Sequence, residues 1–246
     1  MLILLWLYPF LSMASWKGPT KIIHAAWGDA PYKFGFNQGD TRDQFPINVL
    51  IMTDGKIIIE DWVNNKLKIY NERGKYIKFI RQPGLGMFEL SNDKIIGFAW
   101  DDSIKGERIG VYGLEDGTWI WKDKDNVFDS ATTKVKVELN IIYVWDQKFK
   151  GYKYNQDGQV LQKYQDKPAL FESGIRDADG NEYHIDHNRV IRKDHHSKKE
   201  KPLQINLPDR NGSEHGRPMI NRKGDVFVWH KTSRSYAVLK WTWVPD

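Results

Sequence analysis

Tryptophan, aspartate and histidine recur in pairs at five places, each directly after a short apolar segment. A carboxylate accepts hydrogen bonds or binds a cation, and an indole ring stacks on a sugar or on an apolar side chain. If the five places lie together, they form a rim that suits a sugar, a peptide or a cation. The pairs are Asp61-Trp62, Trp100-Asp101, Trp145-Asp146, Asp186-His187 and Trp229-His230.

A structural explanation of the same residues stays open. An aspartate after a strand often accepts hydrogen bonds from backbone N–H groups of the following turn. A tryptophan at a strand end is equally suited to wedge between neighbouring sheets. For each residue taken alone the structural role is favoured, while the rim as a whole stays a candidate ligand face.

The remaining candidates do not form a catalytic or metal-binding pattern. Zinc needs three or four ligands within ~2.0 to 2.3 Å, but His184 and His187 straddle a strand end and His195-His196 lies in a basic hairpin. Asp101-Asp102 supports acid–base chemistry only if burial raises one pKa. There is no cysteine, no phosphate-binding glycine loop and no Gly-x-Ser-x-Gly motif. We expect no metal and no cofactor, with calcium or zinc held by several repeats as the alternative.

These residues belong to a repeating pattern of short strands and tight turns. The clearest copy has strands expected at 49–52, 56–61, 66–70 and 75–80. Four further copies have strands expected at 87–90, 94–99, 108–112 and 118–121; 134–138, 141–145, 149–154 and 159–164; 174–176, 182–185, 189–192 and 202–207; and 218–220, 225–229, 236–240 and 241–244. Gly55 and Gly224 hold equivalent turn positions four repeats apart, which gives a period of about 42 residues.

This period, without any helical spacing of apolar residues, predicts an all-β fold: a β-propeller of four-stranded antiparallel blades. In such a fold the turn between the second and third strands of every blade emerges on one face. The five residue pairs are therefore expected around one mouth of a central channel. Thr20–Trp27 is a further strand-like stretch that would close the ring as the outer strand of the last blade.

The first repeat also carries a recognisable series of residues. It contains Phe34-Gly35-Phe36, Phe45-Pro46, Asp54-Gly55, a second strand ending in Asp61, and Asn64-Asn65-Lys66. The series resembles the NHL-repeat consensus of six-bladed propellers, with Lys66 in place of the usual arginine; residues 179–192 match it in part. The resemblance implies six blade positions, one of them degenerate, with five as the alternative. It implies little about function, because such propellers include binding modules, RNA binders and lyases.

Residues 1–14 are a candidate export signal. The apolar run Leu2–Leu11 is about half the ~20 residues of a membrane span, and Ser12-Met13-Ala14 offers small residues for cleavage. No lysine or arginine precedes the run, so a strand of a mis-started reading frame is the alternative. We expect no transmembrane span, one propeller domain over 15–246, and a secreted or periplasmic location.

The charge pattern disfavours a nucleic-acid partner. The formal net charge is +5, but residues 189–201 hold six cations and two anions, so the rest of the chain is close to neutral. Nucleic acid binding needs basic residues spread along a face. A solvated outer hairpin explains this cluster better.

Three functional hypotheses follow. The leading one is a non-catalytic, monomeric binding module that presents the Trp/Asp-rich rim to a protein, peptide or glycan. The alternative is a divalent-cation-dependent enzyme that resembles propeller lactonases or lyases, with ligands in the channel. RNA binding is the third, and the charge distribution speaks against it.

Overall fold

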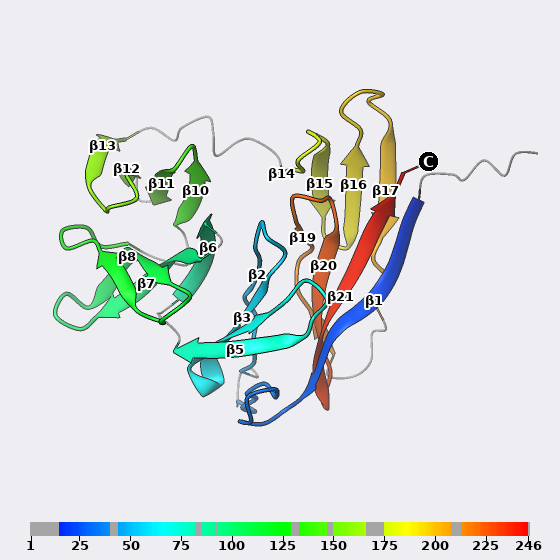
Figure 1. The fold of residues 1–246 in the computed structure, drawn as a ribbon, viewed down its shortest axis with the longest axis horizontal. Coiled ribbons are helices and arrows are strands. Elements are labelled where there is room, and N and C mark those ends of the chain that lie inside the picture. Colours follow the sequence, from blue (N-terminus) through cyan, green and yellow to red (C-terminus); the bar gives the residue numbers. More distant parts are fainter. Residues whose placement is uncertain are drawn as a thin grey trace, which may run out of the picture.

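The computed structural model describes residues 15–39, 44–81, 85–91, 93–128, 133–146, 150–165, 175–207 and 213–245. They form five antiparallel sheets, which we number blades 1 to 5 in chain order (Figure 1). The predicted all-β propeller with four-stranded blades is therefore confirmed. A single 3-10 turn, η1 (Trp62–Asn64), is the one helical segment among the described residues.

The strand bounds follow the predicted repeats closely. Blade 1 contains β2 (Val49–Ile51), β3 (Ile57–Asp61), β4 (Lys66–Tyr70) and β5 (Tyr76–Arg81). Blade 2 contains β6 (Leu85–Ser91), β7 (Lys94–Asp101), β8 (Gly106–Gly113) and β9 (Trp119–Lys122). Blade 3 contains β10 (Lys134–Glu138), β11 (Ile141–Asp146), β12 (Lys150–Tyr154) and β13 (Val160–Tyr164). Blade 4 contains β14 (Ile175–Arg176), β15 (Glu182–Asp186), β16 (Arg189–Lys193) and β17 (Glu200–Gln204). Blade 5 contains β18 (Glu214–His215) and β19 (Met219–Ile220), β20 (Val226–Lys231), β21 (Ser235–Val244) and β1 (Ser15–Ala26).

Four hairpins share one turn device, which explains why the strands form where they do. An asparagine or aspartate side chain accepts the N–H groups of the residues two and four positions later, and a glycine with positive φ stands three positions later. Because the side chain satisfies the turn backbone locally, each hairpin can form from neighbouring residues alone. The four turns are Asn71–Gly74, Asn155–Gly158, Asp177–Gly180 and Asn221–Gly224.

The N-terminal strand completes the last blade, as predicted for Thr20–Trp27. Strand β1 pairs antiparallel with β21 from Ser15↔Val244 to Ala26↔Ser235. The separate strand predicted at 241–244 is wrong, because β21 runs unbroken from 235 to 244 and the fourth position belongs to β1. No sixth blade is found in the part of the chain that the structure describes. The predicted signal, residues 1–14, lies outside it.

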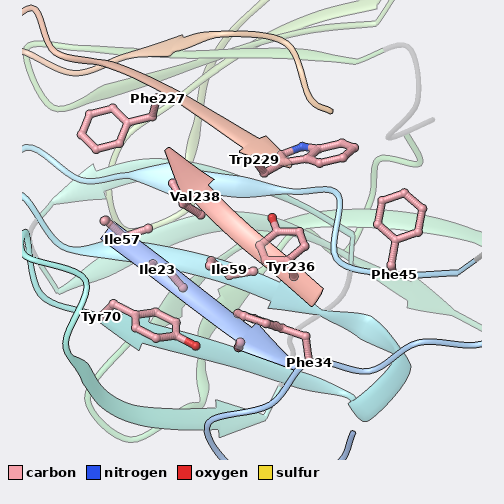
Figure 2. Close-up of a cluster of buried hydrophobic side chains, with 11 residues drawn as sticks. Ile23, Phe34, Phe45, Ile57, Ile59, Tyr70, Phe227, Trp229, Tyr236 and Val238 are labelled. Atoms are coloured by element: carbon pink, nitrogen blue, oxygen red, sulfur yellow. The ribbon is translucent and has the colours of Figure 1, made fainter. Parts of the chain in front are cut away.

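Buried side chains between neighbouring blades make up the core. Apolar clusters join blade 1 to 2, 2 to 3, 4 to 5, and 5 to 1. Among the described residues no such cluster joins blade 3 to blade 4. Figure 2 shows the cluster between blades 5 and 1, where Phe34 and Phe45 enter from the segment that connects β1 to β2. Burying a side chain of this size stabilises the fold by about 1.5–3 kcal/mol.

Candidate functional site

All ten predicted rim residues lie at the same end of the blades. The strands of each blade are antiparallel, so every connection between the second and third strand lies on one face, which we call the upper face. Asp61, Asp101, Asp146 and Asp186 are the last residues of β3, β7, β11 and β15, and Trp229 and His230 stand just before the end of β20. The topology therefore places the ten residues at one face, but their side chains have different surroundings.

Asp61 is buried and tied to its neighbours. Its carboxylate accepts the Gly35 N–H at 3.0 Å and the Asn64 side-chain amide at 2.9 Å. Its Oδ2 lies 2.6 Å from the Lys68 ammonium, and both side chains are 0% exposed. The Lys68 ammonium also lies 4.6 Å from the centre of the Phe34 ring. Asp61 thus has a structural role, but through Gly35, Asn64 and Lys68 and not through the backbone N–H groups of the following turn. Its side chain does not reach the surface.

Three more rim residues are buried as packing. The Trp145 ring stacks on Tyr164, with ring centres 5.9 Å apart and planes 6° apart. Trp229 stacks on Tyr236 and meets the edge of Phe45. Asp146 is 3% exposed. The two tryptophans pack within and between blades, and Trp229 also lines a cavity at the upper face.

Strand β20 of blade 5 ends in a lysine, whereas the second strands of the other blades end in an aspartate. Lys231 occupies the position that Asp61 holds in blade 1, and its ammonium lies 3.1 Å from Glu214 Oε1 and 4.6 Å from the centre of the Phe45 ring. Next to it, His230 is half-buried, and desolvation lowers its pKa, with smaller contributions from His215 and Lys21. Burial therefore favours the neutral form of the His230 imidazole.

The other rim residues are exposed. Trp62 is 39% exposed and its ring N–H donates to the Phe45 carbonyl at 3.0 Å. Trp100 is 59% exposed, and its ring N–H donates to Asp102 Oδ1 at 3.0 Å. Asp186 and His187 hydrogen-bond to each other at 2.8 Å, and this bond lowers the Asp186 pKa. These residues, together with Asp101, keep the rim a candidate binding surface.

Two adjoining cavities mark the upper mouth of the central channel. One, of about 600 Å³, lies between the first strands of blades 1, 2 and 5 and is lined mainly by apolar side chains, including Ile47, Phe88 and Met219. The second, of about 370 Å³, contains Asp186 and His187. Arg217 lines both.

Sequence reasoning missed the residues that come from connections between strands. Ile47 precedes β2 and Arg217 lies between β18 and β19, both outside the predicted strands. Ile47 is 41% exposed beside the channel. The sequence offered one signal for Ile47, because this residue directly follows Phe45-Pro46. That pair served only for the family resemblance.

Neither a metal-binding cluster nor a membrane-spanning helix is found among the described residues. No three histidine, aspartate or glutamate side chains gather there in an arrangement that could hold a metal ion. Within the same residues, no helix has the length and apolar character needed to cross a bilayer.

Neither a protein-family model nor a curated protein sequence matches the chain. Solved structures with a similar fold include BamB from Moraxella catarrhalis (14% identity, 84% of this chain and 46% of that chain, TM-score 0.37). They also include the WD40 propeller domain of Doa1 (13%, 76% and 60%, 0.33) and the C-terminal WD40 domain of Sif2 (11%, 82% and 70%, 0.38). The chain spans about half the length of the first of these. We assign the fold from the five sheets themselves and take no functional property from these proteins.

Proposed function

We propose that the chain is a non-catalytic, monomeric binding module whose upper face holds a peptide segment of a protein partner. The observation that carries the proposal is the apolar channel mouth of about 600 Å³, which the exposed side chain of Ile47 lines, together with the exposed indole of Trp62 bound to Phe45, two residues before Ile47. The bond from the Trp62 ring to the Phe45 carbonyl holds the indole close to the segment that carries Ile47. Exposed aromatic side chains held in a fixed position beside a pocket are typical anchors of protein interfaces.

The same observations favour a peptide over a folded surface. A channel mouth admits a few side chains of an extended segment, whereas a flat interface needs about 800 Å² on each partner. Arg217 at the junction of the two cavities offers a donor for a peptide carbonyl or carboxylate. The NHL-like residues between Phe34 and Ile80 support placing the module among propellers of that kind.

We also propose that the module works outside the cytoplasm after removal of residues 1–14. Among the described residues the register partners of β1 run from Ser15 to Ala26, so a chain that starts at Ser15 keeps all of these pairings. Expression in a secretion-competent host, followed by mass measurement of the exported protein, tests this. A product that starts near Ser15 supports export, and an intracellular product that retains Met1 contradicts it.

Selection from a random-peptide library displayed on phage tests the binding function. The Trp62→Ala variant is expected to bind the enriched peptides about 30-fold more weakly, because truncating an aromatic anchor costs about 2 kcal/mol. Phe79→Ala is the matched control, because Phe79 is 43% exposed on the outer strand β5, away from the channel mouth. Failure to enrich any peptide, or equal weakening by both variants, contradicts the proposal.

A further inference from the structure

Blade 2 carries a separate hollow of about 520 Å³ at its upper edge. It is lined by the end of β7 and the following turn, by Arg108 at the start of β8, and by the residues at and after the end of β9. Its volume lies within the range of small-ligand sites. The lining residues are Ala99, Trp100, Asp101, Asp102, Arg108, Lys122, Asp123 and Lys124.

Arg108 brings unused hydrogen-bond donors to this hollow. A guanidinium has five N–H groups. One on Nε donates to Asp101 Oδ2 at 2.7 Å, and Nη1 donates to the backbone carbonyls of Asp123 and Lys124. The two N–H groups on Nη2 have no acceptor among the described residues. The side chain is 14% exposed and held at three points, so its planar fork is fixed in place.

The carboxylates next to Arg108 are already occupied. Asp101 accepts the backbone N–H and hydroxyl of Ser103 as well as Arg108, and these bonds lower its pKa to about 2. The Asp123 carboxylate accepts bonds from Asn126 and from the Tyr154 hydroxyl at 2.5 Å. The hollow therefore offers free donors. The three aspartates in the lining disfavour a dianion such as phosphate more than a single carboxylate.

Trp100 and Asp102, which also line the hollow, have the groups that recognise a sugar ring. Trp100 is 59% exposed, and the bond from its ring to Asp102 Oδ1 limits its rotation. The Asp102 side chain is 85% exposed, so its second oxygen is open to a hydroxyl donor. Lys122 and Lys124, both exposed, add two further positive charges to the wall.

The geometry points to a binding site for a uronic-acid residue of an acidic glycan in the blade 2 hollow. The carboxylate of the sugar accepts charge-assisted hydrogen bonds from the free N–H groups on Arg108 Nη2. The apolar C–H face of the ring packs on the Trp100 indole, and a ring hydroxyl donates to Asp102. This site is separate from the proposed peptide site, which contains none of these three residues.

Calorimetric titration with two tetrasaccharides tests this site. One is built of alternating glucuronic acid and N-acetylglucosamine, and the other is the same compound with its carboxyl groups reduced to alcohols. The acidic form is expected to bind at least tenfold more tightly. Trp100→Ala and Arg108→Lys are each expected to weaken its binding at least tenfold, while Trp62→Ala leaves it unchanged. Lys124→Gln, at an exposed position, is expected to weaken it severalfold.

Equal affinity for the acidic and reduced tetrasaccharides overturns the inference, as does binding that Trp100→Ala leaves unchanged. Tighter binding of a single-stranded oligonucleotide than of the tetrasaccharide overturns it as well. If Arg108→Lys fails to fold, Trp100→Ala and Lys124→Gln still decide, because both replace exposed side chains. Peptide binding that depends on Trp62 stays measurable in the Trp100, Arg108 and Lys124 variants, so failure of the glycan site leaves the proposed function intact.

Discussion

Replacing Asp61 by asparagine distinguishes a structural aspartate from a ligand-binding one. The Asp61 and Lys68 side chains are both 0% exposed, and their charged atoms are 2.6 Å apart. Removing one partner leaves the other as a buried charge, which costs about 3–5 kcal/mol. We expect Asp61→Asn to fall at the upper end of this range, because in either orientation the new NH2 group faces a donor: the Gly35 N–H, or Lys68 and Asn64.

Lys68→Met is expected to cost less, about 3 kcal/mol, because the remaining carboxylate keeps its bonds from Gly35 and Asn64. In the double variant both charges are gone. The total loss is therefore expected to be at least about 2 kcal/mol smaller than the sum of the single losses, a coupling typical of residues in direct contact.

Urea unfolding of the four proteins, followed by tryptophan fluorescence and circular dichroism, measures these free energies. A domain of this kind has a total stability of about 5–15 kcal/mol, so losses of this size are easily measured. If Asp61→Asn costs less than about 1 kcal/mol, or the single losses simply add, then the pair is solvated and the argument for a structural Asp61 is wrong.

Three further predictions concern the blades. Burial raises the pKa of Tyr154 and of Tyr236 well above that of a free tyrosine. The stability that these residues contribute is therefore complete below about pH 10 and is lost as pH rises further, which urea midpoints in alkaline buffers check. Deleting Ser15–Ala26 is expected to lower the free energy of unfolding by more than about 3 kcal/mol, because it uncovers buried side chains and leaves β21 as an edge; a stable, unaggregated deletion variant contradicts this. Gly74→Ala is expected to lower the melting temperature far more than Gly55→Ala, because a Cβ at Gly74 would stand 1.8 Å from a backbone oxygen of β1, whereas at Gly55 its nearest neighbour is a side-chain atom at 3.0 Å.

Much of the fold was readable from the chain because its turns are encoded locally. An asparagine or aspartate with a glycine three residues later forms a complete hairpin turn, as at Asn71–Gly74 and Asn221–Gly224. The strands between the turns then follow from their β-branched and aromatic residues. The order of strands within each blade, and the gathering of the ten rim residues at one face, are consequences of this repeat.

Only the tertiary structure decided which rim residues face solvent. Asp61 and Trp62 are neighbours in the chain, yet one is buried against Lys68 and the other is exposed, because Phe34 covers the ion pair from a segment with no periodic pattern. The hollow at Arg108 depends in the same way on the backbone carbonyls that follow β9. Local sequence thus determines hairpins, whose bonds are made between nearby residues. Burial and binding surfaces depend on contacts between distant segments, and these contacts exist only once the blades have packed together.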